Sequence, residues 1–158
     1  MRRYFNRRGQ IWVETVIYTL IGMAVIGLVL AGALPKINEK KDSLTIERSI
    51  EALGNIDDKI YAVLSASESR RVINLEVKSG SLVIDPAANT ISWIIDSSFE
   101  YSELDKSVPF GNLDVTTTKN GDYEVRLELK YDDFDLKYDD QNINERQFNV
   151  APTPYVIV

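Results

Sequence analysis

The sequence of 158 residues contains no cysteine and no histidine. Without cysteine, the chain can form neither a disulfide framework nor a thiolate metal site. Without histidine, it lacks the commonest general base, the commonest zinc ligand and every Ser-His or Cys-His nucleophile arrangement. We therefore expect a protein that is not an enzyme and that uses no metal and no cofactor.

Basic residues are scarce outside the amino-terminus. The net charge is −6, from 18 basic and 24 acidic residues. Four arginines precede Gln10 with no acid among them: Arg2, Arg3, Arg7 and Arg8. Without these four, 14 basic residues face 24 acidic ones, so the rest of the chain carries a net charge of −10. This acidic balance argues against nucleic acid as a partner.

One long apolar run, residues 11–34, contains no lysine, arginine, aspartate, asparagine or glutamine. As a helix it would be about 36 Å long, enough to cross a hydrocarbon core of roughly 30 Å. The arginines before it predict a cytoplasmic amino-terminus and an extracytoplasmic carboxy-terminal domain. The chain length allows one such domain of roughly 90 to 100 residues.

The run also allows another interpretation, a secretory signal cleaved at its far end. The stretch "LAGALP", residues 30–35, would supply a small-x-small cleavage pattern. The apolar run is about twice the usual length of a signal core, which favours a retained helix.

The residues before the run carry a more specific pattern. Arg7 and Arg8 are followed by Gly9 and Gln10, and Glu14 is the fifth residue counted from Gln10. This order resembles the class III signal peptide of archaeal type IV pilin-like proteins, over about residues 1–35. The resemblance implies that a prepilin peptidase cuts between Gly9 and Gln10 and leaves the apolar helix in place. Trp12 departs from the family, which commonly has a small polar residue there.

Glu14 is the only carboxylate in the apolar run. A charged carboxylate in a bilayer costs roughly 2.5 to 3.5 kcal/mol on insertion scales, so it should have a partner. Cleavage would create one, the new α-amino group of Gln10, in the same chain or in a neighbouring one. The resemblance implies that this pairing docks a new subunit into a filament. The plain alternatives are that Glu14 reaches interfacial water, or that it belongs to a membrane ion pathway.

Beyond the run, Pro35 is expected to mark a kink or break. Apolar residues then recur three or four apart up to Leu64, which predicts an amphipathic helix to about Ser67. We thus expect a basic leader over residues 1–9, a transmembrane or filament-core helix over 10–35, an amphipathic helix over 36–67 and a β-domain over 68–158.

The β-domain is predicted from alternation of apolar and polar residues. "INLEVK" and "SLVID" flank Ser79-Gly80 and are expected to form a hairpin. A second hairpin is expected at Asn120-Gly121, where Tyr123, Val125, Leu127 and Leu129 alternate with charged residues. The fold class is therefore α+β, with six to eight antiparallel strands packed on the helix of residues 44–64.

Two carboxy-terminal segments need their own interpretation. "YDDFDLKYDD", residues 131–140, holds five aspartates that could ligate a hard cation, but alternating Phe134, Leu136 and Tyr138 favour a strand with a solvated acidic face. The ending "APTPYVIV" is apolar and should pair with the sheet or with another subunit.

The resemblance to archaeal type IV pilin-like proteins implies a structural subunit of a type IV pilus-like filament. The resemblance implies four partners: other copies of the chain, the prepilin peptidase, an assembly ATPase and a membrane platform protein. The precursor would lie in the cell membrane and the mature chain in a cell-surface filament, serving adhesion, motility or DNA uptake. The alternative is a single-span protein whose extracellular β-domain binds a ligand or surface partner without polymerising.

Overall fold

The computed structural model describes residues 7–66, 70–137 and 145–157. The chain divides into two compact units, residues 1–38 and residues 39–158. One helix, α1 (Arg7–Leu64), contributes to both units, and the strands belong to the second. The described part contains eight strands: β1 (Ile73–Leu75), β2 (Ser81–Asp85), β3 (Thr90–Ser97), β4 (Ser107–Phe110), β5 (Leu113–Asn120), β6 (Asp122–Lys130), β7 (Arg146–Asn149) and β8 (Tyr155–Ile157).

Helix α1 includes Pro35, which does not end it. Proline lacks the backbone N–H that would bond the preceding turn, but it need not stop a helix whose other hydrogen bonds remain. Of the kink or break predicted at Pro35, the break does not occur, because α1 continues past this residue to Leu64. The helix ends at Leu64, and Ser67, the expected end, lies outside the described residues. The Ser65 hydroxyl and backbone N–H both donate to the carbonyl oxygen of Tyr61, at 2.8 and 3.0 Å, and satisfy that terminal carbonyl.

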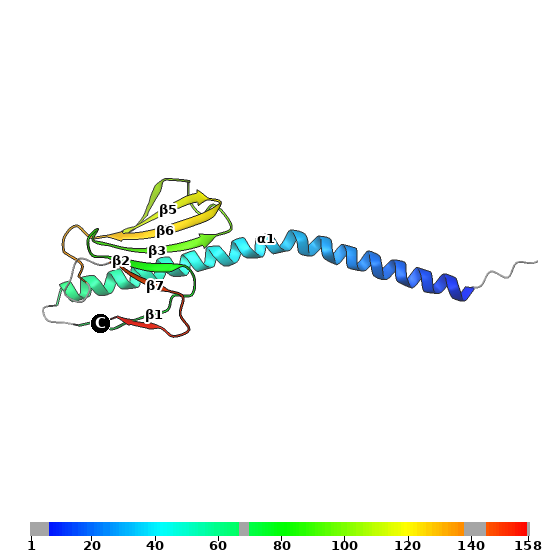
Figure 1. The fold of residues 1–158 in the computed structure, drawn as a ribbon, viewed down its shortest axis with the longest axis horizontal. Coiled ribbons are helices and arrows are strands. Elements are labelled where there is room, and N and C mark those ends of the chain that lie inside the picture. Colours follow the sequence, from blue (N-terminus) through cyan, green and yellow to red (C-terminus); the bar gives the residue numbers. More distant parts are fainter. Residues whose placement is uncertain (1–6, 67–69, 138–144, 158) are drawn as a thin grey trace, which may run out of the picture. The chain divides into compact units, whose positions relative to one another are not determined.

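The α+β fold predicted from the sequence is confirmed. Six strands form an antiparallel sheet in the order β4-β5-β6-β3-β2-β7, and β1 and β8 form a separate two-stranded ribbon. Within the second unit, the sheet lies against the carboxy-terminal part of α1 (Figure 1).

The core of this unit fills the space between α1 and the inner face of the sheet. Helix residues Ile46, Leu53 and Ile56 are buried, as the three- and four-residue spacing predicted. Leu44 and Leu64, at the ends of the predicted apolar face, are exposed. From the strands come the alternating residues of the central pair β3 and β6, all buried: Ile91, Trp93, Ile95, Val125, Leu127 and Leu129.

The hairpin predicted at Asn120-Gly121 joins β5 to β6. Its register pairs Lys119 with Tyr123 and Asn120 with Asp122, so Gly121 alone separates the two strands and the expected two-residue turn is not formed. Gly121 has φ +91°, a left-handed conformation that a glycine adopts without steric cost.

The hairpin predicted at Ser79-Gly80 is wrong. β1 pairs with β8, in the register Ile73 with Ile157, and β2 pairs with β3 and β7. The apolar ending of the chain is thus held by a strand of its own chain. Gly80 is required for another reason: its φ is +71°, and a Cβ there would lie 1.9 Å from the carbonyl oxygen of Ile94.

The acidic segment is not a strand over its described residues, 131–137. The Asn89 side chain donates to the carbonyl oxygens of Tyr131 and Phe134, and it accepts from the backbone N–H of Leu136. Phe134 and Leu136 pack on the core while the three aspartates at 132, 133 and 135 are exposed. The segment keeps the predicted division into apolar and acidic faces without a β-ladder. Tyr138, Asp139 and Asp140 lie outside the described residues.

Candidate functional site

The apolar side chains that the structure describes in the first unit, from Trp12 onward, are left uncovered by the unit's other described residues. One helix of the described residues is long and apolar enough to cross a membrane, and its most apolar 18-residue window has a mean hydropathy of 2.3 with none of it buried. Large side chains such as Trp12 and Leu28 are exposed by 73% and 76%. Water is a costly surrounding for so much apolar surface, and contact with lipid or with other protein would remove that cost.

Three glycines interrupt this surface at five-residue intervals, Gly22, Gly27 and Gly32. A Cβ built at any of the three would meet no atom within 4 Å. Small residues at such positions let another helix backbone approach closely. The apolar part of α1 therefore suits contact with other helices as well as with lipid.

Glu14 lies on this apolar surface and is exposed. The hydroxyl of Tyr18, one turn further along α1, donates a hydrogen bond of 3.4 Å to its Oε1. That bond is long, and a neutral hydroxyl does not compensate the charge of a carboxylate. Residues 11–34 contain no lysine or arginine, so a cation for Glu14 must come from outside this segment.

The proposed cleavage residues lie at the start of α1. Its first turn includes Arg7, Arg8, Gly9 and Gln10. The side chains of residues 7–11 lie outside what the structure describes, so no contact with Glu14 is assigned. Cleavage between Gly9 and Gln10 would leave a helix that begins at Gln10, with Glu14 one turn inside it.

The β-domain holds a buried carboxylate that the sequence patterns did not single out, Asp57. Its Oδ1 accepts a 3.0 Å hydrogen bond from the hydroxyl of Tyr131, and its Oδ2 accepts a 3.1 Å bond from Nδ2 of Asn112. Burial, followed by the neighbouring Asp57 carboxylate, raises the pKa of Tyr131 above its ordinary value of 10.0. The sequence does carry a signal for this buried carboxylate. Asp57 follows Leu53 by four residues and precedes Ile60 by three, which places an acid on the apolar face of the helix.

A second carboxylate fixes the other end of the docked helix. Oδ2 of Asp42 accepts from the backbone N–H and the hydroxyl of Ser98, which follows β3, at 2.9 and 2.5 Å. Asp42 and Asp57 together hold α1 against the sheet at two points, 15 residues apart. These hydrogen bonds stabilise the docking of α1 on the sheet. Among the described residues, no group of three or more Asp or Glu side chains could hold a metal ion.

Comparisons with protein-family models, with curated proteins and with solved structures find no match. The function is therefore inferred from the residues of this chain: an uncovered apolar helix, one carboxylate within it, and a β-domain docked on the same helix.

Proposed function

We propose that the chain is a pilin, a structural subunit of an archaeal type IV pilus-like filament. It would enter the membrane through the apolar part of α1, lose residues 1–9 to a prepilin peptidase, and then join other copies through that helix. An assembly ATPase and a membrane platform protein would drive the process. The β-domain, outside the membrane, would form the filament surface.

The observation that carries the proposal is Glu14 on the uncovered apolar surface of α1. An apolar helix alone would equally suit a simple membrane anchor. An anchor has no use for a carboxylate that raises the cost of insertion and has no cation in its own segment. A filament has a use for it, because the α-amino group created at Gln10 of one subunit can pair with Glu14 of a subunit displaced along the axis.

The substitution Glu14→Gln tests this role. Glutamine keeps the size and hydrogen-bonding capacity of glutamate and removes its charge, so membrane insertion and cleavage should proceed. If charge pairing docks the subunit, the processed variant should accumulate in the membrane with few or no filaments. Electron microscopy of sheared surface material and an immunoblot of the membrane fraction measure the two quantities.

Two controls sharpen the experiment. Glu47→Gln removes a carboxylate from an exposed position of α1 outside the apolar run and should leave filaments unchanged. Tyr18→Phe removes only the long hydrogen bond to Glu14 and should also leave the number of filaments unchanged. Wild-type filament numbers in Glu14→Gln would refute the docking role, and loss of processing would place Glu14 in the recognition sequence of the peptidase.

A further inference from the structure

Two adjoining cavities open between the end of α1, the β1-β8 ribbon and the sheet. Their volumes are about 610 and 380 Å³, and they share Ile60, Ile73, Lys137 and Ile157 as lining residues. Apart from cations, the lining is apolar, with Leu82, Ile84 and Phe148 from β2 and β7. We call the two cavities together the cationic groove. Its size and apolar walls are typical of a site that another molecule fills.

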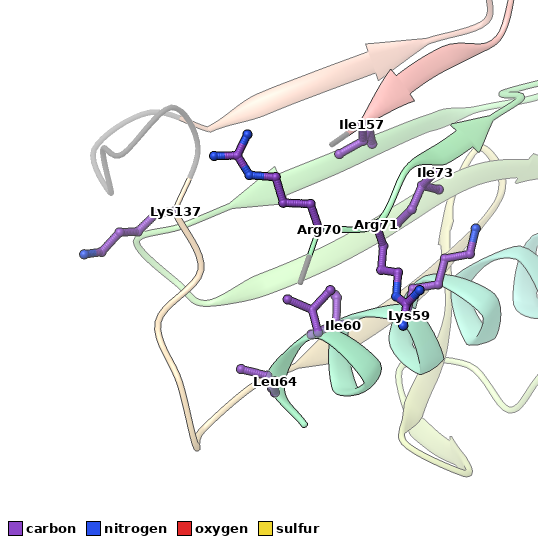
Figure 2. A pocket seen from close by; sticks show the side chains of 9 residues that line it. Lys59, Ile60, Leu64, Arg70, Arg71, Ile73, Lys137 and Ile157 are labelled. Atoms are coloured by element: carbon purple, nitrogen blue, oxygen red, sulfur yellow. The ribbon is translucent and has the colours of Figure 1, made fainter. Parts of the chain in front are cut away.

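Four cations line the groove: Lys59, Arg70, Arg71 and Lys137. Figure 2 shows them distributed around the apolar side chains of α1 and the ribbon. In the described part of the chain none of the four forms an ion pair; Lys59 makes a hydrogen bond of 3.4 Å to the carbonyl oxygen of Val72. The described lining includes no acid. In so acidic a protein, four cations beside an apolar hollow predict an acidic occupant.

A surface of the opposite kind lies at the β4 edge of the sheet. Phe110, the last residue of β4, is 64% exposed beside a hollow of about 400 Å³. Three acids line this hollow, Glu51, Asp57 and Asp58, with no lysine or arginine among the described lining residues. Asp57 is bonded to Tyr131 and Asn112, which leaves the exposed Glu51 and Asp58 to face outward. We call Phe110, Glu51 and Asp58 the acidic edge.

The two surfaces cannot meet within one chain. β4 is one edge of the six-stranded sheet, whereas the groove lies by β7 at the other edge and by the ribbon. Exposed aromatic side chains are preferred anchors in protein interfaces, and surrounding charges select the partner. The acidic edge therefore fits the cationic groove of another copy.

We infer that the β-domains of neighbouring copies bind head-to-tail, with Phe110 of one copy in the cationic groove of the next and with Glu51 and Asp58 beside its cations. A contact between two different surfaces repeats without closing and so builds a chain of subunits. The inference deepens the proposed function and rests on it, because helix packing in a filament would raise the effective concentration of the two surfaces.

Cross-linking of the full chain in cells tests the contact. Because the sequence contains no cysteine, the introduced cysteines are the only thiols of this chain that can react. One cysteine replaces Val108, which lies on β4 near Phe110, and the other replaces Val72, which follows Arg71 of the groove. Both positions are exposed, so Val108→Cys and Val72→Cys can react with the cross-linker. A chain with both cysteines, treated with a flexible bis-maleimide, should give a ladder of dimers, trimers and larger species. Each single-cysteine chain should stay monomeric. Dimers from a single-cysteine chain would show a symmetric contact and overturn the inference.

Charge reversal tests the chemistry of the contact. Lys59→Glu with Arg71→Glu should reduce the ladder at least about tenfold, because like charges then face each other. Glu51→Lys with Asp58→Lys should do the same. All four changes together should restore most of the ladder, a rescue that misfolding cannot imitate. Lys119→Glu, at the tip of the β5-β6 hairpin, is the matched control and should have no effect. Absence of rescue would overturn the inference.

The combined outcomes separate this inference from the proposed function. Filaments with a ladder support both. Filaments without a ladder overturn the head-to-tail contact and leave the pilin proposal standing, and they would direct attention to a small anionic amphiphile as the occupant of the groove. A ladder in membranes without filaments supports the contact and refutes the pilin proposal. Neither filaments nor a ladder overturns both.

Discussion

At the scale of single residues, Asp57 shows how a polar group is accommodated in an apolar core. A buried carboxylate is costly unless donors surround it. Tyr131 and Asn112, 74 and 55 residues away in sequence, supply one donor to each of its oxygens. The sequence places Asp57 on the apolar face of a helix, but neither donor can be assigned from it, because both come from distant parts of the chain.

Removing one donor should weaken the domain. Tyr131→Phe keeps the ring and leaves Oδ1 of Asp57 without its hydroxyl, so the free energy of unfolding should fall by about 1–3 kcal/mol. Urea unfolding of the detergent-solubilised chain, followed by circular dichroism, measures this. Tyr61→Phe is the control, because Tyr61 is exposed and packs against Tyr131 and Phe134 by its ring. Equal stability of Tyr131→Phe and the parent would contradict the structural role of this bond.

Tyr131 should also make stability depend on pH at the alkaline end. Its pKa is raised in the folded state by burial and by Asp57, so the folded state favours the neutral phenol. This contribution is complete below the unfolded value of about 10 and is lost as pH rises above it. Unfolding measured between about pH 8 and pH 11 should show a steeper alkaline loss in the parent than in Tyr131→Phe. Parallel curves would contradict the assignment.

At the scale of elements, the alternation of side chains predicted the central strands and their buried faces. Ile91, Trp93 and Ile95 are buried on one face of β3, and Val125, Leu127 and Leu129 lie opposite them on β6. The error at Ser79-Gly80 has a physical reason. Ser79-Gly80 carries the local signal of a hairpin turn, but β1 pairs with β8, about 80 residues away. Pairing between distant segments leaves no short-range pattern to detect.

Gly80 provides a test of the β2-β3 packing. An alanine in left-handed conformation costs roughly 1–2 kcal/mol. Gly111→Ala, at φ +69° with no atom within 4 Å of the new Cβ, should cost about that much. Gly80→Ala, at φ +71°, should cost clearly more, because its Cβ would collide with the backbone of Ile94. Urea unfolding of both variants gives the comparison, and equal losses would show that the close approach to Ile94 is not present.

At the scale of the whole molecule, charge and apolarity are segregated along the chain. Four arginines without an acid lie at the amino-terminus, the apolar run follows, and acids outnumber basic residues in the rest of the chain. Such one-dimensional order is readable from sequence, which is why the helix, its possible membrane span and the α+β class could be predicted. The cationic groove could not, since Lys59, Arg71 and Lys137 come together only through the fold.

Intact-mass spectrometry of this chain in sheared surface filaments tests the central claim most directly. The account predicts that the chain is a component of those filaments and that its mass corresponds to an amino-terminus at Gln10. A Gly9→Val chain should remain in the membrane at precursor mass, because a side chain there obstructs close approach of the backbone to the peptidase. A surface protein that begins after the apolar run, near Pro35, or a chain that keeps its leader and never appears in filaments would contradict the account.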